Sequence, residues 1–288
     1  MSDAVVTDES ATRRWRSLAW GPNWPVRIAT AVLIVVAMAA LFARWLAPQD
    51  PLRIDLSNAL AKSSMAHWLG TDQSGRDIAS RLVWGARPSL VGAVAVVFVS
   101  TILGLVVGVM SAWRGGWFDT VMSRVTDVMF SFPGLLLAIL AVSLFGSGLT
   151  SPVLALALAY MPYIARFARS ATLAEREQPY IAAARVQGFG AWSINIRHLV
   201  PNIVPLVMAQ ATINFGYALI DLAALSFLGL GIQPPDADWG VMIAEGQSGV
   251  LRGSPQQALA AGACIVATVV AVNIIGERLA DRISRRVE

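Results

Sequence analysis

The feature that most constrains this chain is a series of long apolar runs separated by short polar segments. A helix rises about 1.5 Å per residue, so a run of about 20 apolar residues can cross a hydrocarbon core of about 30 Å. Lipid offers no hydrogen bonds to the backbone, so each run must satisfy its own polar groups as a helix. Six runs are expected to span a membrane: 26–46, 88–113, 121–145, 151–167, 203–230 and 258–276.

The composition agrees with this interpretation, because 56% of the 288 residues are hydrophobic and only 14% are charged. The sequence therefore predicts an all-α, polytopic membrane protein with six transmembrane helices. The first run follows several arginines, as a secretory signal would, but it is too long and lacks a small-residue cleavage site. We expect it to remain as an uncleaved helix.

The basic residues predict the orientation, because Lys and Arg are retained on the cytoplasmic side. With both termini in the cytoplasm, 15 of the 22 basic residues fall in or beside cytoplasmic segments. The predicted division is a cytoplasmic tail at 1–25, a transmembrane domain at 26–280 and a cytoplasmic tail at 281–288. Within that domain the polar segments are outer loops at 47–87 and 231–257 and an inner loop at 170–202.

Cysteine and histidine are too few for common metal or redox chemistry. Cys264 is the only cysteine, and His67 and His198 fall on opposite sides of the predicted membrane. No metal site and no catalytic residue is therefore predicted. The net charge of +4 follows from the cytoplasmic arginines, so no nucleic acid partner is needed to explain it.

The inner loop contains the stretch "YIAAARVQGFGAWSINIRHLVPN", residues 180–202. Pro179 suits the first turn of a short helix, and Gly188 and Gly190 then interrupt it. The segment "AWSINIRHL" is expected to form a second short helix, after which Pro201 opens the fifth span. By composition alone, an amphipathic helix resting on lipid headgroups is an equally good interpretation. Three apolar side chains are available to one face: Phe189, Trp192 and Ile196.

This stretch resembles the cytoplasmic loop of ABC importer permeases, in which Glu-Ala-Ala is followed by three residues, Gly, nine residues and Ile-x-Leu-Pro. The spacing from Gly188 to Pro201 is kept, whereas Ala182 replaces the glutamate. Glu175 and Glu177 are candidates to replace the ionic contact of that glutamate. The resemblance implies an ATPase-coupling role for six residues: Ala183, Gly188, Phe189, Trp192, His198 and Pro201.

Four further segments are similar to signatures of the dipeptide, oligopeptide and nickel group of these permeases. They are "LGTDQSGRDIASRLVWGARPSL", "RVTDVMFSFPGLLLAI", "SFLGLGIQPPDADWGVMI" and "NIIGERLADRISRR". Their order is that expected of the C-type permease subunit, which has six spans and a long first outer loop. The outer-loop signature includes Gly70, Thr71, Asp72, Gly75, Arg76 and Asp77.

The resemblance implies a division of labour among several polypeptides. The chain lacks a Gly-x-x-x-x-Gly-Lys-Ser/Thr phosphate-binding loop, so ATP and magnesium are expected on partner ATPase subunits and this chain is not an enzyme. The implied partners are a homologous permease, two ATPase domains, an extracytoplasmic substrate-binding protein and membrane lipid.

The implied location is the plasma membrane of a prokaryote. The expected solute is a di- or oligopeptide, with nickel chelates and glutathione as alternatives.

Several polar residues have two interpretations each. The outer charges Asp72, Arg76 and Asp77 contact a delivered solute or its binding protein, or they form a solvated, mutually paired cap. Asp221 lies at membrane depth within the fifth run, which makes it a candidate for lining the substrate passage. There it meets a peptide amino group, or it only hydrogen-bonds a neighbouring helix. Asp127 is expected to order helix packing or to face the cytoplasm.

The remaining candidates concern contacts between helices. His198 is expected to be a hydrogen-bonding strut rather than a proton switch. Gly104 and Gly108 form a Gly-x-x-x-Gly face, which favours close helix contact inside this chain or between two permeases.

Two other function classes are weighed against import driven by ATP. An ion-coupled secondary transporter would need a relay of intramembrane acids and usually shows internal repeats, neither of which is found here. A membrane-embedded enzyme would need clustered His, Asp or Glu at membrane depth, and the two histidines lie on opposite sides.

Overall fold

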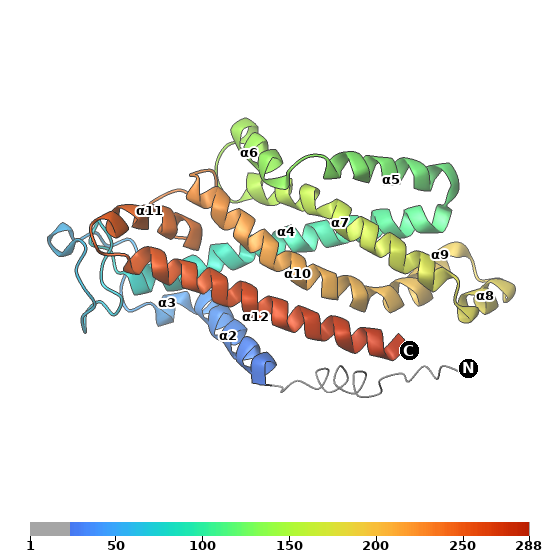
Figure 1. The fold of residues 1–288 in the computed structure, drawn as a ribbon, viewed down its shortest axis with the longest axis horizontal. Coiled ribbons are helices and arrows are strands. Elements are labelled where there is room, and N and C mark those ends of the chain that lie inside the picture. Colours follow the sequence, from blue (N-terminus) through green and yellow to red (C-terminus); the bar gives the residue numbers. More distant parts are fainter. Residues whose placement is uncertain (1–23, 288) are drawn as a thin grey trace, which may run out of the picture.

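The protein is a bundle of long helices, with short helices at both ends (Figure 1). The computed structural model describes residues 24–287, apart from the side chains of 282–287. Within that range there is no strand, and Thr71 and Asp77 form an isolated bridge. The helices are α2 (Trp24–Leu41), α3 (Ala43–Leu46), a 3₁₀ turn (Leu56–Asn58), α4 (Ile78–Arg114), α5 (Gly116–Phe130), α6 (Gly134–Phe145), α7 (Thr150–Arg176), α8 (Pro179–Val186), α9 (Ala191–Ile194), a π-helical turn (Asn195–Leu199), α10 (Val200–Phe227), α11 (Trp239–Leu251) and α12 (Gln256–Val287).

The predicted all-α membrane fold is confirmed. In the described range, α2, α4, α7, α10 with the turns before it, and α12 are each long and apolar enough to cross a bilayer. The pair α5 and α6 supplies a sixth span if the two are counted together. In space α4 packs along α7, and α10 packs along α12 and α4.

The third run differs from the single straight helix that was expected. It is broken between α5 and α6, whose axes meet at 81°. Pro133 has no N–H to donate and disfavours a helical conformation at Phe132. Prolines inside α4, α7 and α10 do not break those helices, so proline alone is not sufficient. Here the next residue is Gly134, a poor helix former, and two weak positions in succession end the helix.

The segment "AWSINIRHL" also differs from the expected separate helix. It continues through the π-helical turn into α10, so residues Ala191–Phe227 form one helical element of 37 residues. The inner loop is therefore joined to the fifth span without a flexible linker.

The two polar regions lie at opposite ends of the bundle (Figure 1). Helix α3, the loop 47–77 and α11 occupy one end, while α8, α9 and the C-terminal end of α12 occupy the other. This arrangement agrees with loops on opposite sides of a membrane. The arginines Arg13, Arg14 and Arg16 of the tail 1–25 lie outside the described residues, as do the side chains of the tail 281–288 beyond residue 281. The cytoplasmic location of the termini stays a prediction.

The Gly-x-x-x-Gly face serves packing within this chain. A Cβ atom on Gly104 would lie 2.6 Å from the Cβ of Ile164, and one on Gly108 would lie 2.8 Å from the backbone nitrogen of Arg169. Both distances are too short for real contacts, so glycine is what lets α4 and α7 approach closely. Of the two interpretations left open by the sequence, the structure supports the internal contact.

This packing predicts that Gly108→Ala destabilises the protein by about 1–3 kcal/mol, because the added methyl group forces the helices apart. The matched control is Gly262→Ala on α12, where nothing lies within 4 Å of the new Cβ. There the substitution should be neutral or stabilising by up to about 1 kcal/mol, since alanine is the better helix former. Thermal unfolding of both variants in detergent, followed by tryptophan fluorescence, checks this, and equal unfolding temperatures would contradict it.

Candidate coupling loop, outer cap and intramembrane acid

The inner loop is anchored to the bundle by a small apolar core of its own. Ile181 on α8, Ile194 on α9 and Leu199 in the π-helical turn are all buried. They form one cluster with Val109 of α4 and Ile203 of α10. The loop is therefore attached to α4 and α10 through buried apolar side chains.

Gly188 ends α8 with a Schellman motif. Its N–H donates to the Arg185 carbonyl at 3.0 Å, and the next N–H, that of Phe189, donates to the Ala184 carbonyl at 3.1 Å. The motif needs a left-handed residue, and Gly188 has a φ of +83°, in agreement with the glycine turn expected from the sequence. The Gly-Phe-Gly stretch is thus a helix cap.

The opposite side of the loop presents apolar side chains that residues 24–287 leave exposed. Val186, Phe189, Trp192 and Ile196 are exposed, and Trp192 is 79% exposed. Ala183 on α8 is exposed as well. The ring of His198 lies edge-on to Phe189, with 6.1 Å between the ring centres. Pro201 lies in the exposed first turn of α10. The residues named for coupling are therefore gathered in one loop, with most of them on its outer surface.

Glu175 joins three helices at the base of this loop. It accepts hydrogen bonds from the Tyr180 hydroxyl of α8 and from the Asn202 amide of α10, the latter at 3.1 Å. The Asn202 amide also donates to the Tyr180 oxygen at 2.7 Å. Partial burial is the main cause, and the hydrogen bond to Glu175 the second, of a rise in the pKa of Tyr180 to about 12. The Tyr180 hydroxyl therefore remains a donor at neutral pH. Of the two acids considered as replacements for the glutamate at Ala182, Glu175 makes these contacts, whereas Glu177 is largely exposed.

The outer charges form a paired cluster that is buried rather than solvated. Arg76 Nε lies 2.6 Å from Asp72 Oδ2, and its Nη2 lies 2.9 Å from Glu245 Oε1. Arg81 Nη2 lies 2.6 Å from Glu245 Oε2. Asp72, Arg76 and Arg81 are all buried. This geometry favours the structural interpretation of these residues, because their charges are turned toward each other.

The other residues of the outer signature shape the turn that carries the cluster. Gly70 and Gly75 have positive φ values of +82° and +74°. Thr71 donates its hydroxyl to the Asn58 carbonyl, and it accepts from the backbone N–H of Ala61 at 2.8 Å.

Asp77 fixes the point at which α4 begins. It caps that helix by accepting from the backbone N–H of Ser80 at 2.8 Å, and its other oxygen lies 3.0 Å from His67 Nδ1.

Asp238 fixes the start of α11 beside the end of α10. It accepts from the Ser226 hydroxyl at 2.6 Å and from the backbone N–H of Val241 at 2.7 Å. Burial raises the pKa of the Asp238 carboxyl, while these hydrogen bonds lower it. The second outer loop is therefore attached to the bundle at Asp238 and again at Glu245.

Asp221 lies on α10 and meets a tyrosine from α7. The Tyr160 hydroxyl donates to Asp221 Oδ2 at 2.9 Å. Both side chains line a cavity of about 110 Å³ beside the break between α5 and α6. The hydrogen bond to a neighbouring helix that the sequence allowed is present, and so is open space at the carboxylate.

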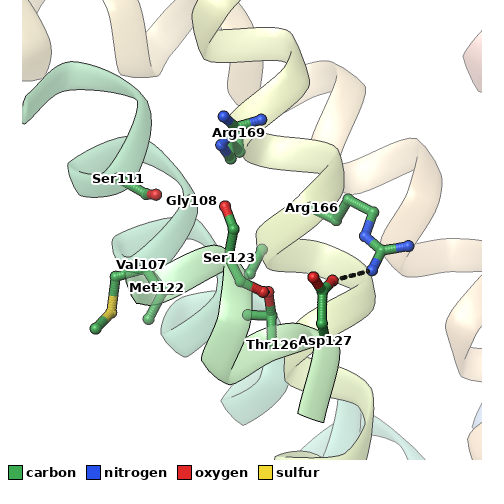
Figure 2. Close-up of a pocket in the computed structure, with 10 residues that line it drawn as sticks. Val107, Gly108, Ser111, Met122, Ser123, Thr126, Asp127, Arg166 and Arg169 are labelled. Atoms are coloured by element: carbon green, nitrogen blue, oxygen red, sulfur yellow. Dashed lines mark hydrogen bonds and ion pairs between the residues drawn. The ribbon is translucent and has the colours of Figure 1, made fainter. Parts of the chain in front are cut away.

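A larger cavity of about 420 Å³ lies between α4, α5 and α7 (Figure 2). Asp127 of α5 points toward Arg166 of α7, with 2.9 Å between Oδ1 and Nη2. In the first turn of α5, Asp119 accepts two hydrogen bonds from Arg169, both at 2.6 Å. Asp127 thus takes part in helix packing. Among the described residues, no three His, Cys, Asp or Glu side chains are grouped so that they could hold a metal ion.

Comparisons with known proteins agree with this architecture. A family model described as the inner membrane component of binding-protein-dependent transport systems matches residues 104–288. The glutathione transport system permease protein GsiD of Pectobacterium atrosepticum is 36% identical, over 99% of this chain and 95% of the relative. The nickel transport system permease protein NikC of Escherichia coli K12 is 35% identical, over 91% and 94%. The chain belongs to this family of ABC importer permeases.

A solved chain of the MetNI methionine ABC transporter, captured facing inward, is similar in fold. The TM-score is 0.58 at 21% identity, and the match covers 70% of this permease and 96% of that chain. The family assignment makes the permease a multi-pass protein of the bacterial inner membrane. The expected resemblance to the dipeptide, oligopeptide and nickel group is confirmed.

Three residues that shape these sites in the permease were not singled out from the sequence. Arg81 lies inside a quoted signature and Glu245 lies two residues beyond another, but nothing local indicates that they meet across 164 positions. Tyr160 lies 61 positions from Asp221 and is surrounded by ordinary apolar residues. Only the fold brings these pairs together.

The outer cluster predicts that Glu245→Gln destabilises the permease strongly, by about 3–5 kcal/mol, because two buried guanidinium groups lose a counter-ion. Limited proteolysis of the loop 47–77 in membranes provides the measurement, and cleavage should become much faster.

The matched control is Glu177→Gln. Glu177 is 79% exposed, and its nearest ionic partner, Arg176, lies 3.8 Å away. Loss of such an exposed pair should change stability by less than about 1 kcal/mol. Cleavage of Glu245→Gln at the wild-type rate would show that the cluster does not hold the cap in place.

Proposed function

We propose that this permease carries a solute across the membrane by alternating access, together with a homologous permease, two ATPase domains and an extracytoplasmic binding protein. The observation that carries the proposal is the construction of the inner loop. One side is packed into the bundle through Ile181, Ile194 and Leu199, and the other side exposes Phe189 and Trp192. A loop with this division is suited to receive motion from a partner and to pass it on.

The path for that motion is a rigid one. The 37-residue element from Ala191 to Phe227 would extend over about 55 Å as a straight helix, which is more than the thickness of a bilayer. It begins in the loop and carries Asp221 farther along. Movement of the docking surface is therefore expected to displace the residues around Asp221.

ATP and magnesium belong to the partner ATPase domains in this proposal. The chain has no Gly-x-x-x-x-Gly-Lys-Ser/Thr loop, and Lys62 is its only lysine. The permease then contributes the passage and the coupling loop and carries out no chemistry of its own. ATP binding would close the ATPase domains and turn the passage outward, and hydrolysis would reset it.

The proposed solute is a di- or oligopeptide. The relatives are named for glutathione and nickel transport. Glutathione is itself a short peptide, so two of the three candidate solutes share amide groups and a free ammonium. A nickel chelate is the alternative within the same mechanism. Asp221 is proposed to line the passage, because it lies at membrane depth beside open space.

The docking role of the loop predicts that Trp192→Ala weakens association with the ATPase subunits about tenfold or more, since a buried tryptophan is often a dominant contact in an interface. The side chain is exposed in the isolated permease, so its abundance and thermal stability should stay unchanged. Trp45→Ala is the control, because Trp45 is 75% exposed at the opposite end. Co-purification with the ATPase subunits and ATP hydrolysis in vesicles are measured. If the Trp192→Ala variant bound the ATPase subunits as strongly as the wild type does, the docking role would be wrong. The loop would then be interpreted as a helix on the lipid surface.

The solute proposal predicts saturable uptake of dipeptides into vesicles that contain the complete transporter and its binding protein. Unlabelled glutathione should compete, because it presents the same groups, whereas a nickel chelate should not. Transport of the nickel chelate alone would establish the alternative. This outcome does not affect the coupling proposal, which is tested separately by ATP hydrolysis.

A further inference from the structure

The cavity beside Asp221 lies where the third span is broken. It is lined by Asp221 and Tyr160 from α10 and α7, by Phe130 at the end of α5, and by Phe132 within the 81° bend. Interrupted spans that border a cavity are where membrane transporters commonly hold their solutes. The volume of about 110 Å³ is that of a few water molecules, or of an ammonium group with its first carbon atoms.

Asp221 differs from the two acids of α5 in its partners. Asp119 is paired with Arg169. Asp127 is paired with Arg166 (Figure 2). In the part of the chain that the structure describes, no basic side chain forms an ion pair with Asp221, and the Tyr160 hydroxyl is its hydrogen-bond donor. One neutral donor leaves most of the acceptor capacity of a carboxylate unused.

The rest of the wall combines the aromatic rings of Phe130, Phe132 and Tyr163 with Met129, Gly134 and Ala159. Tyr163 lies edge-to-face on Phe130, with 4.6 Å between ring centres, and 6.0 Å from Tyr160. Aromatic faces attract cations, most strongly where water is excluded. The Phe130 ring already makes one such cation–π contact, because the guanidinium carbon of Arg166 lies 4.2 Å from its centre. A carboxylate without a cationic partner, set among aromatic rings, is suited to a positively charged group.

We propose that this cavity binds the cationic group of the transported solute, a primary ammonium, with Asp221 as its counter-ion. Tyr160 is a positioning residue that holds the carboxylate toward the cavity. The proposal rests on the function proposed above and assigns the site at which the permease itself recognises its solute. An uncharged or purely anionic solute gains nothing from this site.

The first test measures the charge of the cavity without measuring transport. Cys264 is the only cysteine, so a Cys264→Ser chain provides a thiol-free background. Phe132→Cys then places a thiol at the exposed edge of the cavity in the complete transporter. Its modification rates by a cationic and an anionic methanethiosulfonate of similar size are compared. An ionised Asp221 nearby should favour the cationic reagent about fivefold or more, relative to a free thiol.

Variants at Asp221 and Tyr160 identify the source of this preference. Asp221→Asn should abolish it, and Asp221→Glu should retain it, since the charge remains. Tyr160→Phe should reduce it, because the carboxylate loses its orienting donor. An equal preference in the wild type and in Asp221→Asn would overturn the proposal, and so would a wild type without any preference.

The second test uses dialanine and N-acetyl-dialanine as probes. Saturating dialanine should slow modification of Phe132→Cys, and the acetylated peptide, which lacks the ammonium, should not. Protection by dialanine should disappear in Asp221→Asn. Equal protection by both peptides would sink the ammonium site while leaving the permease proposal intact. Failure of the permease proposal would appear separately, as a loop that does not engage the ATPase subunits.

Discussion

The close contact between α4 and α7 is the interaction on which the rest of the structure depends. It exists because Gly104 and Gly108 have no side chains to hold the two helices apart. At the inner end of the contact, Arg176 of α7 donates to the Ala112 carbonyl of α4 at 2.8 Å. Nearby, Asp119 connects Arg169 of α7 to the Ser111 hydroxyl of α4. Polar groups that lipid would leave unsatisfied are thus paired between these two helices.

The charged residues of the outer cap fix the position of α11 against α4 more than they add to the stability of the fold. A buried ion pair loses much of its Coulomb energy to desolvation, and an apolar replacement is often as stable. Asp72, Arg76, Arg81 and Glu245 can only be paired when α11 lies in one position against the start of α4. The same holds for Asp238, which attaches α11 to Ser226 at the end of α10. The cluster therefore selects one arrangement of the second outer loop.

The sequence predicted the elements of this fold better than their contacts. Apolar runs are local, so the five long apolar helices and the bent pair α5–α6 were all located, and the turn at Gly188 was found because a left-handed residue favours glycine. The break at Pro133 was missed because a proline by itself does not mark a break. Other prolines in this chain lie within continuous helices. Pairs such as Arg81 with Glu245 join distant segments and depend on packing that no local pattern encodes. Asp221 was identified from its depth alone, but its cavity appeared only when α7 and the α5–α6 break were placed beside it.

The same helix carries the end of the proposed coupling loop and the intramembrane acid, and this arrangement limits how the two can move. Leu199 is buried against α4 at the start of the helical element, and Asp221 lies about 33 Å farther along it, six turns away. Tyr160, which orients Asp221, belongs to α7, and α7 is held against α4. A shift of α10 relative to the α4–α7 pair therefore changes the Asp221–Tyr160 distance directly. The hydrogen bonds from Tyr160 to Asp221 and from Asn202 to Glu175 both join α7 to α10, so such a shift would change both of them.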